Sequence, residues 1–412
     1  MKVVLSHPTG NTFVRATARA LHQRSWLGAF YTTVAAPAAA DLLPAALRRQ
    51  LARRQFAGIP RELLRTRPWR ESMRLAADAL GVAALTAPGR PASVDAVYAD
   101  LDRHVAGALG SAHAGAVDAI YAYEDGAAAS FAAARQRGIA CVYELPIAHW
   151  HLTQRLLREE AQRLPAWRVT LRGIDDDRRK LERKDRELEL ADTVVVPSRF
   201  VLDSLPAHVS AVKRCIVAPF GAPASPGTTR HRPATSRLRV LFAGALSQRK
   251  GLADLFAAMR LLNRDDVELV VLGSAVAPLD FYRREYAAFT YEPPRPHDGV
   301  LTLMRTCDLL ALPSIVEGCA LVQQEALASG LPLVVTANAG GDGLVVDGVN
   351  GFVVPIRAPE AIAARLAWFA DHRDALEQMR EEAYCTAAAR PWEHYEAAVC
   401  EAVAPPERQV AC

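Results

Sequence analysis

The sequence predicts an α/β protein of two doubly wound domains in tandem that face a common cleft. Short apolar runs of the kind that form buried parallel strands alternate with helical patterns in both halves of the chain. A stretch rich in Gly, Pro, Ser and Thr, residues 221–236, separates the two halves. The 412 residues are also too many for one ordinary core. We therefore expect a ligand site in the cleft between the domains.

The first half begins with a strand, a turn and a helix. Residues 3–5 are apolar, residues 8–11 form a Pro/Gly turn, and residues 13–21 have a helical pattern. Further elements are expected at 119–123, 140–143, 193–197 and 215–218 (strands) and at 127–137 (an alanine-rich helix). This alternation predicts a parallel sheet with helices up to about residue 220.

The second half repeats the pattern. A strand at 238–243 and a loop at 244–251 precede a helix whose apolar face recurs at i, i+3, i+4 and i+7; its members are Leu252, Leu255, Phe256, Met259 and Leu262. A returning strand at 267–272 completes a βαβ unit. The remaining elements are expected at 309–312, 333–336 and 351–355 (strands), in a helix that ends at Gly330 and in a helix that Pro359 opens.

Composition and charge exclude several classes of protein. A net charge of +4 is mild for this length and argues against a nucleic-acid binder. The seven cysteines are scattered without a CxxC pair, which favours reduced thiols in the cytosol and no structural zinc. The first apolar run is too short for a signal peptide, and no stretch reaches the roughly 18 apolar residues of a membrane span. We expect a cytoplasmic protein, dissolved or peripheral on the inner face of a membrane.

The segment 313–326 carries the strongest chemical signal. A strand ends, a glycine turn follows, and a helix begins near Ala320, so that free backbone amides and the helix dipole favour a phosphate. Glu317 precedes this helix and Glu325 lies within it. Eight helical positions rise roughly 12 Å, about the reach from a donor sugar across a diphosphate to its ribose. The alternative is an ordinary loop glutamate and a solvated helix glutamate at a chance separation.

The strand-to-helix loop 242–251 carries the second signal. Gly244 and Gly251 permit a ligand to approach the backbone, and the adjacent cations Arg249 and Lys250 could neutralise a leaving diphosphate. Alone, the loop is equally consistent with a surface turn that carries solvated charges.

Together, the two segments resemble the donor domain of retaining glycosyltransferases of family 4 (glycosyl transferases group 1). Those enzymes have the GT-B fold, two Rossmann-like domains that face a cleft. The resemblance covers about residues 180–400, and it continues through 330–336, 347–355 and 392–395. It implies an acceptor-side domain at 1–220, a linker at 221–236 and a nucleotide-sugar donor domain at 237–389. A C-terminal segment, 390–412, is expected to join the acceptor-side domain.

The resemblance also implies roles for residues of the second domain. Glu325 would hold the donor ribose, Glu317 a hydroxyl of the transferred sugar, and Lys250 the diphosphate. The other residues expected to line the donor are Gly244, Arg249, Gly318, Cys319, Ala320 and Leu321. One departure is Ala245, where many relatives carry arginine; Arg249 is the candidate to supply that charge. The base and the sugar are expected to contact the loop after residue 272, including 281–292, which has no readable code.

The first domain fits the family less closely. Gly10 and Asn11 stand where the family has a glycine-rich turn that faces the donor phosphates. His149 follows a strand, where relatives often place an active-site histidine, although a histidine beside Trp150 is at least as often a packed structural residue.

A basic segment at 43–75 holds nine arginines interleaved with apolar residues. Such a segment can rest on anionic lipid. The alternative is a solvated helical face, and lipid contact is favoured because acceptors in this family are often lipid-linked.

The resemblance implies transfer of a hexose-type unit from a nucleoside-diphosphate sugar, with retention, to a saccharide or lipid-linked acceptor, in bacterial surface polysaccharide or glycolipid assembly. No cofactor and no metal are expected, because cations and helix-start amides can carry the phosphate charge. The acidic run 175–177 is typical of a solvated helix start. A nucleotide-sugar epimerase of the same fold and a non-catalytic sugar-nucleotide-binding module remain alternatives. A nicotinamide-dependent dehydrogenase is disfavoured, since no GxGxxG follows the first strand.

Overall fold

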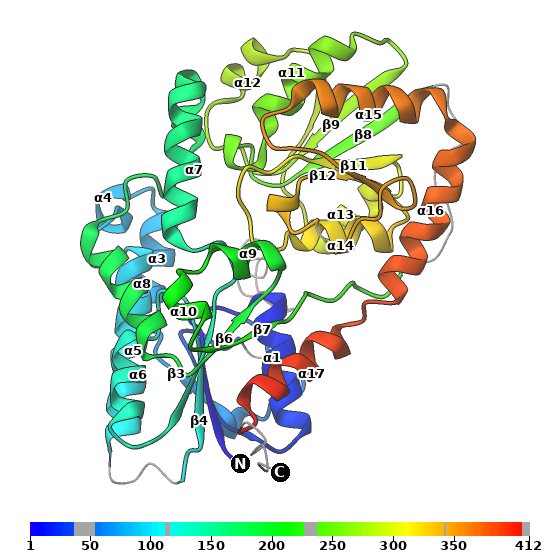
Figure 1. Ribbon diagram of the computed structural model, residues 1–412. Coiled ribbons are helices and arrows are strands. Elements are labelled where there is room, and N and C mark those ends of the chain that lie inside the picture. The colour runs from blue at the N-terminus through cyan, green and yellow to red at the C-terminus, as the bar shows by residue number, and fades with distance from the viewer. Residues whose placement is uncertain (37–53, 112–115, 226–236, 342, 406–412) are drawn as a thin grey trace.

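The protein is built on two parallel β-sheets, each covered by helices (Figure 1). A computed structural model describes residues 1–36, 54–111, 116–225, 237–341 and 343–405. The first sheet has seven strands in the order β3-β2-β1-β4-β5-β6-β7, and the second has six in the order β10-β9-β8-β11-β12-β13. The predicted fold class, two doubly wound α/β domains, is confirmed. In both sheets the strand order reverses beside the first strand, which is where α/β sheets place their ligands.

The strands of the first sheet are β1 (Val3–Ser6), β2 (Leu27–Thr32), β3 (Leu64–Thr66), β4 (Ala119–Tyr123), β5 (Ala140–Glu144), β6 (Thr193–Val196) and β7 (Arg214–Val217). Its helical segments, in chain order, are α1 (Thr12–Gln23), η2 (Arg61–Leu63), α3 (Trp69–Ala79), α4 (Ala83–Thr86), α5 (Val94–Gly110), α6 (Ala128–Arg135), α7 (Trp150–Arg163), η3 (Pro165–Thr170), α8 (Arg178–Leu190), α9 (Arg199–Ser204) and α10 (Ala207–Ser210). The central strands β1, β4 and β6 are buried along their whole length, as expected for a parallel sheet covered on both faces.

The strands of the second sheet are β8 (Leu238–Ala243), β9 (Val267–Leu272), β10 (Phe289–Glu292), β11 (Leu309–Leu312), β12 (Leu333–Val335) and β13 (Gly351–Val353). Its helical segments are η4 (Gln248–Lys250), α11 (Leu252–Leu262), α12 (Leu279–Glu285), α13 (His297–Met304), α14 (Leu321–Ala328), η5 (Ala337–Ala339), α15 (Pro359–Asp371) and α16 (Arg373–Ala388). The apolar face predicted for α11 is buried from Leu252 to Met259.

The last helix, α17 (Trp392–Val403), returns to the first sheet and packs against α1 (Figure 1). Its Tyr395 is fully buried in the same hydrophobic cluster as β1. Gly221 makes this return possible, because a side chain there would lie 2.5 Å from the Cα of Trp392. The C-terminal segment therefore adds to the first domain.

Two regions differ from the predictions. Residues 281–292 were expected to form a loop, but they contain the end of α12 and the edge strand β10, which pairs with β9 in parallel. For the basic segment 43–75, the alternative of one continuous helical face does not hold, because η2 and the edge strand β3 interrupt it. Residues 43–53 of that segment, and 226–236 of the predicted linker, lie outside the described residues.

Helix α7 leaves the carboxyl end of β5 and runs alongside the second domain (Figure 1). The η3 turn that follows it carries Trp167, which is 2% exposed and belongs to the hydrophobic core of the second domain. In the described part of the chain, no helix combines the length and the apolar character that crossing a membrane requires.

Candidate active site

The loop after β8 and the turn after β11 lie side by side, since these two strands are neighbours in the sheet. The backbone oxygen of Arg249 accepts a hydrogen bond from the amide of Ile315 at 2.9 Å. Gly251 has a φ of +75°, and a side chain there would lie 1.9 Å from the carbonyl oxygen of Pro313. The close approach of the two loops therefore requires glycine at this position.

Three predicted site residues form an ion cluster where these loops meet. Arg249 Nη1 lies 2.8 Å from Glu317 Oε1, and Lys250 Nζ pairs with Glu317 Oε2. The side chains of Lys250 and Glu317 are only 12% and 13% exposed. We call Arg249, Lys250 and Glu317 the ion cluster. It carries one net positive charge when all three groups are ionised.

The charges in the ion cluster determine its protonation state. Burial acting alone would raise the pKa of Glu317, but the charges of Lys250 and Arg249 outweigh burial and lower the pKa to about 2. Burial lowers the pKa of Lys250, and the charge of Glu317 opposes this effect. At neutral pH Glu317 is therefore a hydrogen-bond acceptor and not a proton donor.

The loop after β8 begins with a glycine that lies close to Lys250. Gly244 has a φ of +151°, and a side chain at this position would lie 3.5 Å from Lys250 Cε. Ala245, which stands where many relatives have arginine, is half-buried. Arg249 lies on Glu317, so this arginine supplies a charge at the site from a different position in the loop.

The predicted donor turn at Gly318–Leu321 lies against the first domain. A side chain at Gly318 would come within 1.8 Å of the carbonyl oxygen of Pro146, and Ser198 Oγ donates to the Gly318 carbonyl at 2.7 Å. Cys319 and Leu321 pack in the same hydrophobic cluster as β1. The turn is thus part of the contact between the two domains.

The amides of this turn are not equally available for a ligand. The amide of Ala320 donates to the carbonyl of Ala339 at 3.3 Å, so the expectation that it binds the donor is not supported. The amides of Gly318, Cys319 and Leu321 donate to no acceptor within the described residues. These three are the amides that can bind a phosphate or a sugar at the start of α14.

Glu325 lies on α14 and has a partner that the sequence did not indicate. Its Oε1 lies 3.4 Å from His297 Nδ1 at the start of α13. The contact with Glu325 raises the pKa of His297. No sequence signal marks His297, since it follows the segment without a readable code and only the fold brings it to Glu325.

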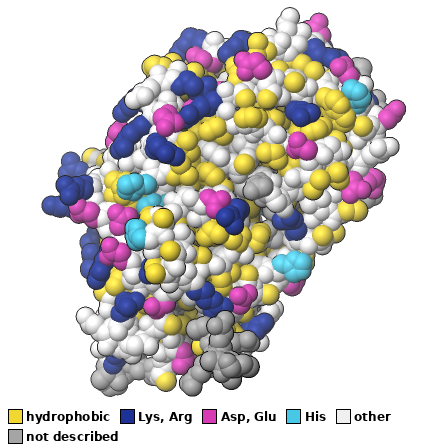
Figure 2. All heavy atoms as spheres, in the orientation of Figure 1, with side chains coloured by type: hydrophobic (Ala, Val, Ile, Leu, Met, Phe, Trp, Pro, Cys, Tyr) yellow, Lys and Arg dark blue, Asp and Glu magenta, His cyan; other side chains and the backbone are white. Residues whose placement is uncertain are grey.

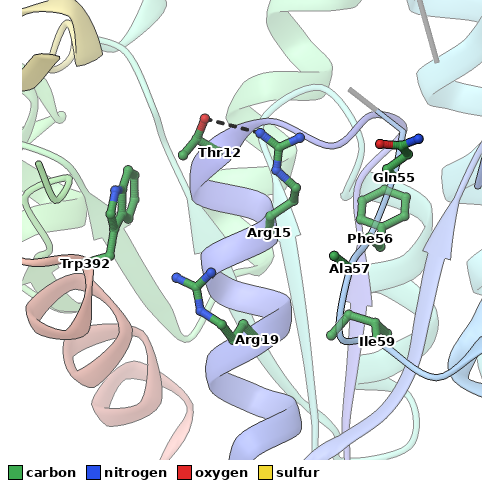
Figure 3. Close-up of a pocket in the computed structure, with 8 residues that line it drawn as sticks. All are labelled: Thr12, Arg15, Arg19, Gln55, Phe56, Ala57, Ile59 and Trp392. Carbon is green, nitrogen blue, oxygen red and sulfur yellow. Dashed lines mark hydrogen bonds between the residues drawn. The ribbon is translucent and has the colours of Figure 1, made fainter. Parts of the chain in front are cut away.

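Gly10 and Asn11 lie where β1 leads into α1. Gly10 is buried, Asn11 is exposed, and the Asn11 carbonyl accepts from the amide of Arg15 at 3.0 Å. A pocket of about 390 Å³ continues along α1 (Figure 3). Arg15 and Arg19 project from one face of the helix, between Trp392 on one side and Phe56 on the other. The pocket combines cationic and aromatic groups on the acceptor-side domain.

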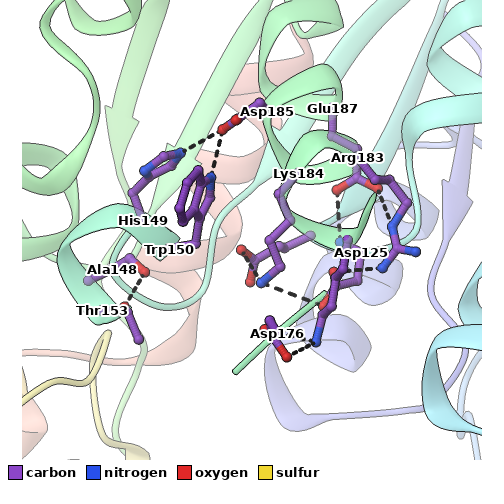
Figure 4. A network of polar contacts seen from close by, with 12 residues as sticks. Asp125, Ala148, His149, Trp150, Thr153, Asp176, Arg183, Lys184, Asp185 and Glu187 are labelled. Atoms are coloured by element: carbon purple, nitrogen blue, oxygen red, sulfur yellow. Dashed lines mark hydrogen bonds and ion pairs between the residues drawn. The ribbon is translucent and has the colours of Figure 1, made fainter. Parts of the chain in front are cut away.

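His149 lies at the start of α7 and faces α8 (Figure 4). Its Nε2 is 3.5 Å from Asp185 Oδ1, the oxygen to which Trp150 Nε1 donates at 2.6 Å. Burial lowers the pKa of His149 to about 4, although Asp185 opposes this shift. No contact among the described residues joins this ring to Glu317 or Lys250. The segment before His149 does approach the turn after β11, since a side chain at Gly318 would meet Pro146 and Ile147. The catalytic role of His149 stays a prediction.

A hollow of about 520 Å³ lies beside the start of α7. It is lined by Trp150 and by basic side chains, including Arg155 and Arg158, and Figure 2 shows basic side chains gathered over this helix. Gln154, which is 3% exposed, also lines it. This hollow is a second cationic surface of the acceptor-side domain.

Two buried titratable groups of the first domain were not identified from the sequence. Burial lowers the pKa of His7 to about 4, and Thr9 donates its amide to His7 Nδ1 at 3.0 Å. Burial raises the pKa of Glu144 to about 7, against the hydrogen bonds that Tyr121 and Tyr395 donate to it. His7 follows β1 and Glu144 is the last residue of β5, so both lie at the carboxyl ends of strands, but a single polar residue at a strand end has no motif.

The basic segment is largely tied to the first domain. Arg54 and Arg74 pair with Glu71, whereas Arg67 and Arg70 pair with Asp100. Arg61 and Arg65 remain exposed. Most of the arginines of this segment that the structure describes are thus paired within the protein.

Part of the chain matches a known protein family. Residues 229–386 match the family described as "Glycosyl transferases group 1". The D-inositol 3-phosphate glycosyltransferase of Paenarthrobacter aurescens is 27% identical over 227 residues, which is 50% of this chain and 53% of that protein. The enzyme of the same name from Streptomyces griseus is 36% identical over 103 residues, or 25% of this chain and 22% of that protein. The matches thus span about half or less of the length of these curated relatives.

Solved structures match over nearly the whole chain. Sucrose-phosphate synthase from Thermosynechococcus elongatus has a TM-score of 0.63 at 18% identity, over 97% of this chain and 98% of that one. HepE from Anabaena in complex with UDP has a TM-score of 0.61 at 16% identity, over 97% and 99%. These likenesses show the GT-B fold, and with the family match they confirm the resemblance that the sequence indicated.

Proposed function

Because this chain carries a glycosyl transferases group 1 domain within a GT-B fold, we propose that it transfers a hexose-type sugar, with retention, from a nucleoside-diphosphate sugar to a saccharide or lipid-linked acceptor. The ion cluster is the observation that carries this proposal. It lies where β8 and β11 end, and the adjacent turn contacts the acceptor-side domain. The solved structures of HepE with UDP and with UDP-glucose support a nucleotide-sugar donor.

Lys250 and Arg249 would bind the diphosphate. As the bond between the anomeric carbon and the phosphate oxygen breaks, negative charge grows on the leaving group, and fixed cations in a buried site stabilise it. The amides of Gly318, Cys319 and Leu321 would add hydrogen bonds to the donor. The charge can thus be carried by the groups present, and we propose catalysis without a metal ion.

Glu317 and Glu325 would orient the donor. Glu317 is ionised at neutral pH, because its pKa is about 2, so it can accept a hydrogen bond from a sugar hydroxyl but cannot protonate the leaving group. Glu325 would accept from the ribose hydroxyls, eight residues further on. His297, at 3.4 Å from Glu325, would lie beside the ribose or the base.

A thermal-shift panel of UDP, GDP, ADP and dTDP tests the donor site. A nucleotide that binds only the native state raises the melting temperature. One diphosphate should stabilise the wild type, and Lys250→Ala and Glu325→Ala should lose that shift. Lys180→Ala, which removes a lysine paired with Asp176 on the first domain, is the matched control and should keep it. If no diphosphate binds, or the site variants respond like the control, the proposed function is wrong.

Product analysis separates the alternatives. An epimerase would convert the donor sugar without an acceptor, and a binding module would bind the nucleotide without turnover. Nuclear magnetic resonance of the product reports the anomeric configuration, and the same assay in a metal chelator tests the proposed independence of metal. Action in surface polysaccharide or glycolipid assembly, at the inner face of a membrane, remains a proposal that acceptor screening tests.

A further inference from the structure

The segment that we call the arm, residues 150–170, comprises α7 and η3. By sequence it belongs to the acceptor-side domain, but it docks on the donor domain. Trp167 contacts the rings of Phe256 and Phe281, with centroids 5.9 and 5.0 Å away, and its Nε1 donates to Glu285 Oε2 at 3.0 Å. The arm therefore buries an aromatic anchor in the core of the other domain.

A buried polar network lies between the arm and the donor domain. Glu160 of the arm is 0% exposed and pairs with Arg357. Arg163 of the arm donates two hydrogen bonds of 2.8 Å to the two oxygens of Asp254, and it also pairs with Glu160. Buried carboxylates thus meet partly buried guanidinium groups across the contact, and the opposite charges satisfy one another.

Gln248 connects this network to the ion cluster. It is fully buried, and its Nε2 donates at 2.7 Å both to Glu160 Oε2 and to Asp254 Oδ2. Its backbone amide donates to Thr170 Oγ1 of the arm at 3.1 Å, and its Oε1 accepts from the Ala253 amide at 2.9 Å. Gln248 directly precedes the two cations of the ion cluster in the sequence, so the position of its backbone constrains the backbone of Arg249 and Lys250.

The η4 turn that carries Arg249 and Lys250 is a single short turn. Its backbone hydrogen bonds run from Lys250 to Ser247, at 3.1 Å, and from Gly251 to Gln248, at 2.9 Å. On one side the Arg249 carbonyl holds the turn after β11, and on the other side the arm holds Gln248. The turn that carries the two cations is thus attached on both sides.

We propose that Thr170, Glu160 and Gln248 are positioning residues, through which the arm holds Arg249 and Lys250 in the geometry that binds the donor diphosphate. This inference rests on the proposed function. It adds that an element of the acceptor-side domain completes the donor site from behind the loop, without touching the donor.

Thr170 permits a selective test, since it is 1% exposed and lies outside the proposed binding groups. Thr170→Val keeps the shape but removes the acceptor of the Gln248 amide, whereas Thr170→Ser keeps the hydroxyl and loses a methyl group. Both changes lower the melting temperature of the free protein. Only Thr170→Val should weaken binding of the diphosphate selected by the thermal-shift panel, by about fivefold, and Thr170→Ser should stay within about twofold of the wild type.

Trp167→Phe is the control for docking of the arm alone. It removes the hydrogen bond to Glu285 and should lower the melting temperature without changing the affinity for the diphosphate, because it leaves Gln248 untouched. Equal affinities for Thr170→Val, Thr170→Ser and the wild type would overturn the inference and leave the proposed function intact. If no diphosphate of the panel binds the wild type, the proposed function fails and this inference fails with it.

Discussion

The ion cluster of the donor domain and the His149 site of the acceptor-side domain show opposite responses to burial. In the first, opposite charges surround Glu317, and its pKa falls to about 2 although the side chain is buried. In the second, Asp185 lies 3.5 Å away and does not compensate for burial, so the pKa of His149 falls to about 4 and the ring is neutral at physiological pH. Burial keeps a group charged only where the backbone brings a well-placed counter-charge with it.

The largest expected effect comes from Glu317→Gln, which breaks the ion cluster. Lys250 and Arg249 would lose their shared carboxylate, and an uncompensated buried charge should destabilise the free protein by about 3 kcal/mol. The freed cations should bind the selected diphosphate more tightly, while loss of the sugar contact should lower turnover about 100-fold. Urea unfolding, calorimetric titration of the diphosphate and a transfer assay measure the three effects.

Asp254→Asn is a control for Glu317→Gln, because it removes a buried carboxylate of the arm network without removing the partner of Lys250. It should destabilise the protein without tightening diphosphate binding. Weaker diphosphate binding by Glu317→Gln would mean that the carboxylate does not compete with the diphosphate for the cations. The interpretation of the ion cluster given above would then be wrong.

Glu144 provides a test of burial without a counter-charge. Its pKa is about 7 in the folded protein and lower when unfolded, so the folded state binds the proton more tightly between pH 4.5 and 7. The free energy of unfolding should therefore fall as the pH rises through this window. Glu144→Gln should reduce that loss by up to about 3 kcal/mol between pH 4.5 and 8. Urea unfolding at both pH values measures it, and identical pH slopes in variant and wild type would contradict the assignment.

His149 has the opposite sign of pH dependence. The folded protein holds the ring neutral down to about pH 4, whereas the unfolded chain takes up a proton near pH 6.5, so stability falls as the pH decreases through this range. His149→Gln should recover about 2 kcal/mol of that loss. Unfolding at pH 7 and pH 4.5 checks it, with the exposed His208→Gln as control. A bell-shaped turnover profile whose acid limb moves in His149→Gln would instead favour the predicted catalytic role.

The smallest effect concerns the exposed arginines of the basic segment. Most described arginines there are paired within the protein, and Arg61 and Arg65 are exposed arginines without an ion pair among the described residues. Arg61→Ala with Arg65→Ala should weaken association with anionic vesicles by about 1 kcal/mol per residue, and not with neutral vesicles. Sedimentation with vesicles of both compositions measures this. Unchanged binding would place any lipid contact elsewhere.

The sequence predicted the elements that neighbouring residues determine, and it missed those that depend on residues distant in the chain. The run at 267–272 is apolar apart from Glu268, and it was predicted with correct ends. Strand β2 mixes buried and half-buried residues without regular alternation, and β10 is a four-residue edge strand, so neither has a run that distinguishes it from a loop. Helix α7 was also missed, because its docking face includes Glu160, a residue type that pattern rules assign to solvent.

Within the site, the sequence predicted what two loops and their glycines determine. Gly251 and Gly318 tolerate no side chain, so the placement of Lys250 and Glu317 follows from short segments. Gln248 and His297 have no comparable signal, because their partners come from α7 and α14. His149 was proposed from its place after a strand, but the packing of α7 against α8 directs its ring.

The docked arm also limits how freely the two halves of this protein can be exchanged with those of relatives. A graft of the donor domain cut at residue 237 would leave behind Trp167, the ring that fills the space beside Phe256 and Phe281. It would also leave Gln248 and Asp254 without Glu160 and Arg163. A working chimera should therefore carry residues 150–170 of this chain with its donor domain. The part that must be exchanged as a whole is not one continuous stretch of the sequence.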